Sequence, residues 1–136
     1  MSNLSAFLNP VSLYEEKEVV VSKRFQDKDG NPVPFKIRSL TEDENDACQK
    51  KARRTRKVNG RLEEYQDQLL YMRSLVVEAT VFPDFREEQL CKKYGTLTPE
   101  EVPGKMLRIG EYSALVSAIM ELSGFEMNTV EEEAKN

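Results

Sequence analysis

The sequence predicts a single α+β domain, in which an N-terminal β-hairpin packs on a small helical body of about four helices. Near the N-terminus, two segments of alternating apolar and polar residues flank a glycine-containing turn. Further on, two longer segments repeat apolar residues with the helical period. The chain of 136 residues has the length of one typical domain. We therefore expect one domain over residues 1–136, with frayed ends at 1–10 and 126–136.

The predicted hairpin consists of the segments Glu18–Phe25 and Val33–Leu40. Both contain β-branched and aromatic residues in alternation with polar ones, which is typical of strands. Gln26–Pro32 connects them and contains Gly30, which can adopt the positive φ that a tight turn needs. Pro34 has no N–H to donate, so the second strand is expected at an edge at that point. Since a single hairpin cannot bury a face alone, it must lie on helices.

A polar helix is predicted from Thr41 to Val58. Thr41 and Glu44 have the spacing of a capping box, and the pair Asn59-Gly60 is expected to end the helix. Acidic residues fill the first turns and cations the last two, an order that the helix dipole favours. The cations are Lys50, Lys51, Arg53, Arg54, Arg56 and Lys57.

This basic run has three interpretations. It can be the solvated end of an ordinary helix, a docking patch for a protein, or a contact surface for nucleic acid. Cations spread around a helix cannot all meet one groove, and no aromatic residue lies among them to stack on bases, so nucleic acid is not expected. If a partner protein binds here, the candidate residues are Arg53, Arg54, Arg56 and Lys57.

The strongest helical pattern covers Arg61–Phe82. Its apolar residues are spaced alternately by three and four positions, which predicts a central core helix that ends before Pro83. The residues of this stripe are Leu62, Tyr65, Leu69, Met72, Val76 and Ala79.

The C-terminal half contains further helix signals. Arg86–Gly95 predicts a short helix with acids first, lysines last and a glycine at its end. Thr98-Pro99 begins a turn that Pro103-Gly104 is expected to end quickly. Gly110–Phe125 predicts an amphipathic helix with Gly124 as its terminating residue.

An apolar triplet marks the N-terminus. Leu4, Phe7 and Leu8 have the i, i+3, i+4 spacing of one helix face. They can pack on their own domain or anchor the chain in a neighbouring subunit, so we include them among the candidate partner-binding residues. The segment lacks the basic start and apolar stretch of a signal peptide, and no apolar run approaches the about 18–20 residues of a membrane span. We expect a soluble, cytoplasmic protein without membrane contact.

The chain lacks the residues for most enzyme chemistry. It has no histidine, so imidazole cannot act as general base or activate a nucleophile. Cys48 and Cys91 are far apart and read as free thiols, and no glycine-rich phosphate loop occurs. The acidic turn at Asp27 and Asp29 resembles a calcium loop in composition only. We predict that the protein is not an enzyme and has no catalytic, metal or cofactor site. Its net charge of −4 argues against a nucleic-acid coat protein.

Three segments carry a family resemblance: "FLNPVSLYEEKEVVVSKRFQDKDGNPVPFKIRSLTEDEN", "VVEATVFPDF" and "RIGEYSALVSAIMELSGF". In pattern and order they resemble the XkdN-like tail assembly chaperones of phages and defective prophages. The resemblance extends from about Leu4 to Asn136 and includes no catalytic motif.

The resemblance implies a non-enzymatic chaperone in the host cytoplasm that binds the tape measure protein, keeps it soluble, and helps tail tube protein assemble around it. Such proteins are absent from the mature tail. Self-association is a further expectation, which the uneven charge along the chain would permit. Two alternatives stay open: a small DNA-binding regulator that uses the basic helix end Lys50–Lys57, and a structural tail component.

Overall fold

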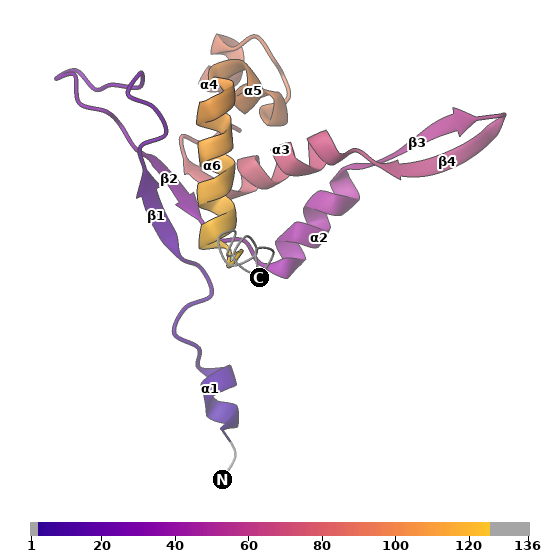
Figure 1. Cartoon of the computed structure of the whole chain (residues 1–136), viewed down its shortest axis with the longest axis horizontal. Helices are drawn as coiled ribbons and strands as arrows, with labels where there is room; N and C mark the ends of the chain where they lie inside the picture. The colour runs from indigo at the N-terminus through magenta and orange to yellow at the C-terminus, as the bar shows by residue number, and fades with distance from the viewer. Residues whose placement is uncertain (1–2, 126–136) are drawn as a thin grey trace, which may run out of the picture.

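The computed structural model describes residues 3–125 and confirms the α+β class (Figure 1). The described residues form a helical body with two small antiparallel sheets, one of three strands and one of two. The expected frayed tail at 126–136, like the first two residues, lies outside the described part. In chain order the elements are α1 (Leu4–Leu8), β1 (Glu16–Val19), β2 (Phe35–Arg38), α2 (Glu42–Lys51), β3 (Arg53–Val58), β4 (Arg61–Gln66), α3 (Gln68–Ala79), β5 (Thr80–Phe82), α4 (Glu88–Lys93), the 3₁₀ turn η1 (Pro99–Glu101), α5 (Val102–Met106) and α6 (Ile109–Leu122).

The predicted N-terminal hairpin is confirmed. β1 and β2 pair antiparallel, with Val19 opposite Phe35. β2 lies within the predicted second strand, but β1 overlaps the predicted first strand, Glu18–Phe25, only at its first two residues. Residues 20–34 therefore form a long connection, in which Gly30 adopts a φ of 83° at a tight turn. The side chain of Asp27 accepts hydrogen bonds from the backbone N–H groups of Asp29 and Asn31, so the acidic turn is held by its own backbone.

β2 is the central strand of its sheet, so the edge position expected from Pro34 is wrong. β5 pairs with the other side of β2, with Lys36 opposite Phe82. Pro34 lies directly before β2 and outside the ladder, where its missing N–H removes no strand pairing.

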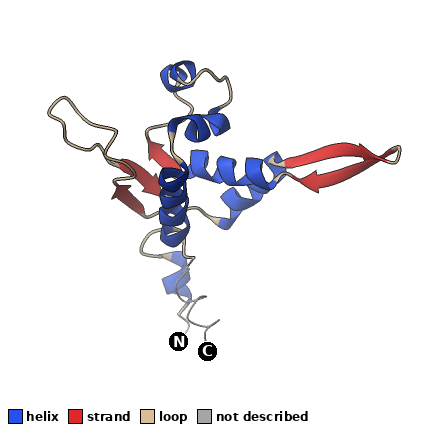
Figure 2. Cartoon of the chain, turned by 45° about the horizontal axis from the view of Figure 1, so that its top comes forward, coloured by secondary structure: helices blue, strands red, loops and turns tan. Residues whose placement is uncertain are grey.

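The core lies between this sheet and the helices. α6 contacts β1 and β2, while α3 contacts β5 and α6 (Figure 2). Each large apolar side chain buried here stabilises the fold by roughly 1.5–3 kcal/mol. The buried cluster consists of Phe35, Ile37, Val76, Val77, Ala79, Phe85, Cys91, Val102, Met106, Leu107, Leu115 and Ile119.

The two predicted helices Thr41–Val58 and Arg61–Phe82 are wrong in part. The capping box of Thr41 and Glu44 is present and α2 begins as predicted, but it ends at Lys51 and the chain continues as strand β3. Asn59-Gly60 forms the two-residue loop of a β-hairpin, with φ values of 53° and 80° that suit the twist of the flanking strands.

The same error affects the predicted core helix. Its first six residues form strand β4, and Leu62, expected in the core, is 73% exposed. The helix α3 begins only after Asp67, whose carboxylate accepts the backbone N–H of Leu70 at 3.0 Å. Thr80–Phe82 then pairs as β5 and is not helical.

The C-terminal helices agree with the predictions from the sequence, except at Pro103. Gly95 and Gly124 follow α4 and α6 with positive φ, as predicted. At the end of α6 the N–H of Phe125 bonds the carbonyl of Met120, which is the pattern of a Schellman motif. Pro103 does not end a turn. It lies in the first turn of α5, where no helical partner needs its N–H.

Arg38 joins the sheet to two helices. Its guanidinium donates to Glu44 of α2 at 3.0 and 2.5 Å and to Glu78 of α3 at 2.8 Å. Glu78 also accepts from Arg86 at 2.7 Å, and Glu44 accepts the backbone N–H of Thr41 at 2.9 Å. The Arg38 guanidinium beside Glu44 holds the pKa of that carboxyl at about 2.

This pair predicts an acid-dependent part of the stability. Because the folded-state pKa of Glu44 is lowered, its contribution is present above about pH 4.5 and disappears as the pH falls toward 2. Glu44→Gln keeps a capping acceptor but loses the charge. We expect its free energy of unfolding to be about 2 kcal/mol below that of the wild type at pH 7 and nearly equal to it near pH 2. Urea denaturation at several pH values measures this.

The control is Glu121→Gln, at an exposed position on α6. It should change the free energy of unfolding little at any pH. An equal difference between wild type and Glu44→Gln at pH 7 and pH 2 would contradict the assigned role of the Glu44 charge.

Candidate functional site

The hairpin of β3 and β4 extends from the body, and no other element among residues 3–125 forms a second layer against it (Figure 1, Figure 2). We call residues 53–66 the ribbon. The stretch Arg53–Lys57 is exposed throughout, and so are the first four residues of β4. Within the described residues the ribbon forms a sheet of two strands only. A two-stranded sheet without a packed face is only marginally stable alone, so its attachment and its tip determine its order.

The strand register divides the ribbon side chains between two faces. Residues directly opposite each other share a face, and neighbours along a strand alternate. One side, the arginine face, carries Arg54, Arg56, Val58, Arg61, Glu63 and Tyr65. The other carries Arg53, Thr55, Lys57, Leu62, Glu64 and Gln66.

The arginine face is partly ordered by its own contacts. The guanidinium of Arg56 lies 4.7 Å from the centre of the Tyr65 ring, a cation–π contact. Arg54 donates to Asp67 at 3.1 Å. Arg54 and Arg56 are two residues apart on one strand, which separates their Cα atoms by about 6.8 Å. The face therefore presents cations at a regular spacing, with an aromatic ring among them.

The root of the ribbon is fixed between α2 and α3. Ala52 is fully buried, and its carbonyl accepts the N–H of Asp67 at 2.9 Å. The N–H of Leu70, followed by the guanidinium of Arg54, lowers the pKa of Asp67 below its usual value. Asp67 thus caps α3 and also connects to β3, so the ribbon leaves the body in a defined direction.

The candidate partner-binding residues that the sequence predicted form two separate groups in the structure. Arg53, Arg54, Arg56 and Lys57 all lie on β3, so the interpretation of this run as a helix end is wrong. Alternation in a strand places Arg54 and Arg56 on one face and Arg53 and Lys57 on the other.

The second group lies elsewhere. Leu4, Phe7 and Leu8 belong to α1 and are 59%, 80% and 69% exposed. Figure 1 shows α1 at the end of an extended segment, away from the ribbon. Packing of this triplet inside its own core, one of the two alternatives, does not occur in the described structure.

Sequence reasoning missed Arg61 and Tyr65 as members of the basic surface, because it placed them on a separate helix. One signal could have identified them. Asn59-Gly60 is a strong signal for a two-residue hairpin loop, and it outweighs helical spacing over so few turns.

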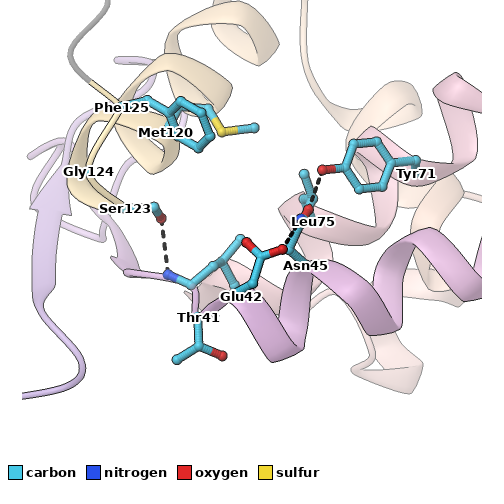
Figure 3. A pocket seen from close by; sticks show the side chains of 10 residues that line it. Thr41, Glu42, Asn45, Tyr71, Leu75, Met120, Ser123, Gly124 and Phe125 are labelled. Carbon is cyan, nitrogen blue, oxygen red and sulfur yellow. Dashed lines mark hydrogen bonds between the residues drawn. The ribbon is translucent and has the colours of Figure 1, made fainter.

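A groove lies where α6 ends and α2 begins (Figure 3). It has a volume of about 310 Å³. The hydroxyl of Ser123 accepts the N–H of Leu40 at 3.0 Å, and Tyr71 donates to Asn45, so the walls are tied together. The lining residues are Leu40, Thr41, Glu42, Asn45, Tyr71, Leu75, Met120, Ser123, Gly124 and Phe125.

In the part of the chain that the structure describes, we find no cluster of side chains suited to metal binding and no activated thiol. Among residues 3–125, no group of three or more His, Cys, Asp or Glu side chains could hold a metal ion. Burial raises the pKa of the Cys48 thiol, which disfavours the nucleophilic thiolate. No helix within the same residues has the length and apolar character needed to cross a bilayer.

Comparison with known proteins identifies relatives over nearly the whole chain. A family model described as phage XkdN-like tail assembly chaperone protein matches residues 4–135. The phage-like element PBSX protein XkdN of Bacillus subtilis is 38% identical over 127 residues, which cover 90% of this chain and 85% of that protein. The protein YqbN of the same organism is 39% identical over the same lengths. A crystal structure of YqbN superposes with a TM-score of 0.76 at 33% identity and covers 93% of this chain and 99% of the other.

The turn of the ribbon can be tested by mutation. Gly60 has a φ of 80°, so Gly60→Val forces a β-branched side chain into a left-handed conformation at a cost of about 1–2 kcal/mol. We expect the ribbon to open while the core stays folded. Amide hydrogen exchange should accelerate over residues 53–66, with little change in the melting temperature.

Gly110→Ala is the matched control, because a Cβ at Gly110 meets nothing within 4 Å and its φ is not positive. It lies in α6 and should leave exchange in the ribbon unchanged. Unchanged exchange over residues 53–66 in Gly60→Val would contradict the assigned turn.

Proposed function

The chain belongs to the XkdN-like family of phage tail assembly chaperones, and on that basis we propose that it binds a tape measure protein, keeps it soluble, and assists assembly of the tail tube around it. The proposed role is non-enzymatic and is performed in the host cytoplasm. Family membership supports the chaperone role. The partner and the binding surface are our inference from the chemistry of the described residues.

We propose the arginine face of the ribbon as the surface that binds the tape measure protein. The observation that carries this proposal is a basic β-hairpin that leaves the body with both faces exposed. Arginine and tyrosine are enriched among residues that dominate binding energy, and this face combines Arg54, Arg56 and Arg61 with Tyr65. Docking would cover a sheet that has no layer of its own.

The spacing of the cations favours an acidic helix as the segment that docks. Carboxylates four residues apart on a helix are separated by about 6 Å along its axis. Arg54 and Arg56, two residues apart on a strand, are separated by about 6.8 Å. A helix laid along β3 can therefore place one carboxylate at each guanidinium, which permits paired charge-assisted hydrogen bonds.

Charge reversal on this face tests the proposal. The chain is co-expressed with its neighbouring tape measure protein, and co-purification and the soluble fraction of the partner are measured. We expect the wild type to co-purify and Arg54→Glu/Arg56→Glu to weaken binding at least tenfold, because two attractive contacts become repulsive.

Lys92→Glu/Lys93→Glu is the matched control. It makes the same change of charge at exposed positions on α4 and should bind like the wild type. Failure of the wild type to bind or solubilise the tape measure protein would overturn the proposed function. Equal binding by both double variants would overturn only the proposed surface.

A small DNA-binding regulator is the second candidate, and the ribbon gives it a specific basis. A two-stranded β-ribbon fits the major groove of duplex DNA. Phosphate contacts would make the affinity fall steeply with salt. Duplex binding at low salt that Arg54→Glu/Arg56→Glu abolishes, without tape measure binding by the wild type, would favour this candidate.

The proposed role also predicts where the protein is found. A chaperone that leaves after assembly should be present in induced cells and absent from purified tails. Quantitative mass spectrometry of both fractions measures this, with the tail tube protein as reference. A fixed ratio to the tube protein in purified tails would instead identify a structural tail component.

A further inference from the structure

The N-terminal segment carries an exposed apolar surface. We call Asn3–Leu13 the arm. It contains no charged residue, although 32% of the whole chain is charged. Phe7, Leu8, Val11 and Leu13 are 80%, 69%, 105% and 68% exposed. Large exposed apolar surfaces of this kind mark interaction sites in soluble proteins.

The arm is fixed at one end. The N–H of Glu15 donates to the Ser39 hydroxyl, and the N–H of Ser39 donates to the Glu15 carbonyl, both at 2.8 Å. The Tyr14 ring lies 4.9 Å from the guanidinium carbon of Arg38. Beyond this root, the six Cα–Cα steps from Leu13 to Phe7 can extend at most about 20 Å. Phe7 can therefore reach well beyond the sheet while β1 stays in place.

The groove described above offers a matching surface. Its apolar walls include Leu40, Leu75, Met120 and Phe125 (Figure 3). Its volume of about 310 Å³ equals that of roughly ten water molecules, enough space for an aromatic side chain. In both views α1 lies on the side of the molecule where α6 ends and α2 begins (Figure 1, Figure 2).

We propose that two copies of the chain associate by placing the arm of each in the groove of the other. An arm and a groove on the same side of one molecule permit a reciprocal two-fold exchange, which closes at two copies. The arm supplies eleven residues and the groove ten, in line with the about 20–30 residues a side of a stable interface. The uncharged arm brings no charge of its own into the groove, and Glu42, the charged residue among those that line it, lies at an exposed position.

The exposure of the arm favours a second copy over the groove of the same chain. Phe7 and Leu8 are 80% and 69% exposed, so the arm does not occupy the groove of its own body in this structure. This proposal concerns the arm and the groove only and does not rest on binding of the tape measure protein.

Light scattering coupled to size-exclusion chromatography tests the association over a range of concentrations. We expect the wild type to form dimers and Phe7→Asp/Leu8→Asp to dissociate at least 100-fold more readily. Leu97→Asp is a control at a position that is 98% exposed elsewhere on the molecule, and it should remain dimeric. A wild type that is monomeric at all concentrations would overturn the proposal, and so would a dimer that Phe7→Asp/Leu8→Asp leaves intact.

Disulfide trapping distinguishes exchange between copies from folding back. A mixture of Phe7→Cys and Glu42→Cys proteins should give a crosslinked heterodimer on mild oxidation, while the native Cys48 and Cys91 are buried. Phe7→Cys mixed with Lys92→Cys should give none. A double variant Phe7→Cys/Glu42→Cys that crosslinks only within monomers would show that the arm occupies its own groove and would overturn the proposal.

Discussion

The guanidinium of Arg38 is the interaction on which the arrangement of this protein depends. It lies at the end of the central strand and bonds one carboxylate on α2 and another on α3. β2 and α2, which follow each other in the chain, thereby share one polar junction with α3, whose Glu78 lies 40 residues after Arg38. The direction of α2 and α3 follows from it, and the root of the ribbon lies between these two helices. Tyr14 packs on the same guanidinium, so the root of the arm is fixed there as well.

The molecule therefore consists of a compact body and two projections with different chemistry. The ribbon is basic and hydrogen-bonded within itself, and it suits an acidic partner surface. The arm is uncharged and apolar, and it suits a groove. Both projections have roots at the Arg38 junction or next to the helices that it holds, and the two proposed binding events use no residue in common.

The sequence predicted those parts of the fold whose signals are local and chemically specific. The Thr41–Glu44 capping box, the glycines that end α4 and α6, and the turn at Gly30 were all predicted correctly. The helical pattern also predicted α6 correctly, because Leu115 and Ile119 of this pattern are buried in one core.

The wrong predictions arise where helical spacing and turn preference favour different structures for the same segment. The spacing of Leu62, Tyr65 and Leu69 fits a helix, yet these residues belong to a strand and to the start of α3. The turn preference of Asn59-Gly60 and the pairing of β3 with β4 outweighed that spacing. The groove could not be predicted at all, because its walls come from segments about 80 residues apart and only tertiary packing brings them together. The proposed site residues on β3 were identified by charge alone, and their division between two faces follows from strand geometry.

The open edges of the ribbon have a consequence for contacts between copies of this protein. In a two-stranded sheet each strand has an outer edge whose N–H and C=O groups can pair with another chain, and such edges nucleate fibres. Lysine and arginine along an edge oppose the approach of a second identical strand. The cations of β3 therefore disfavour pairing between the β3 edges of two copies, which leaves that edge open to a strand of different charge.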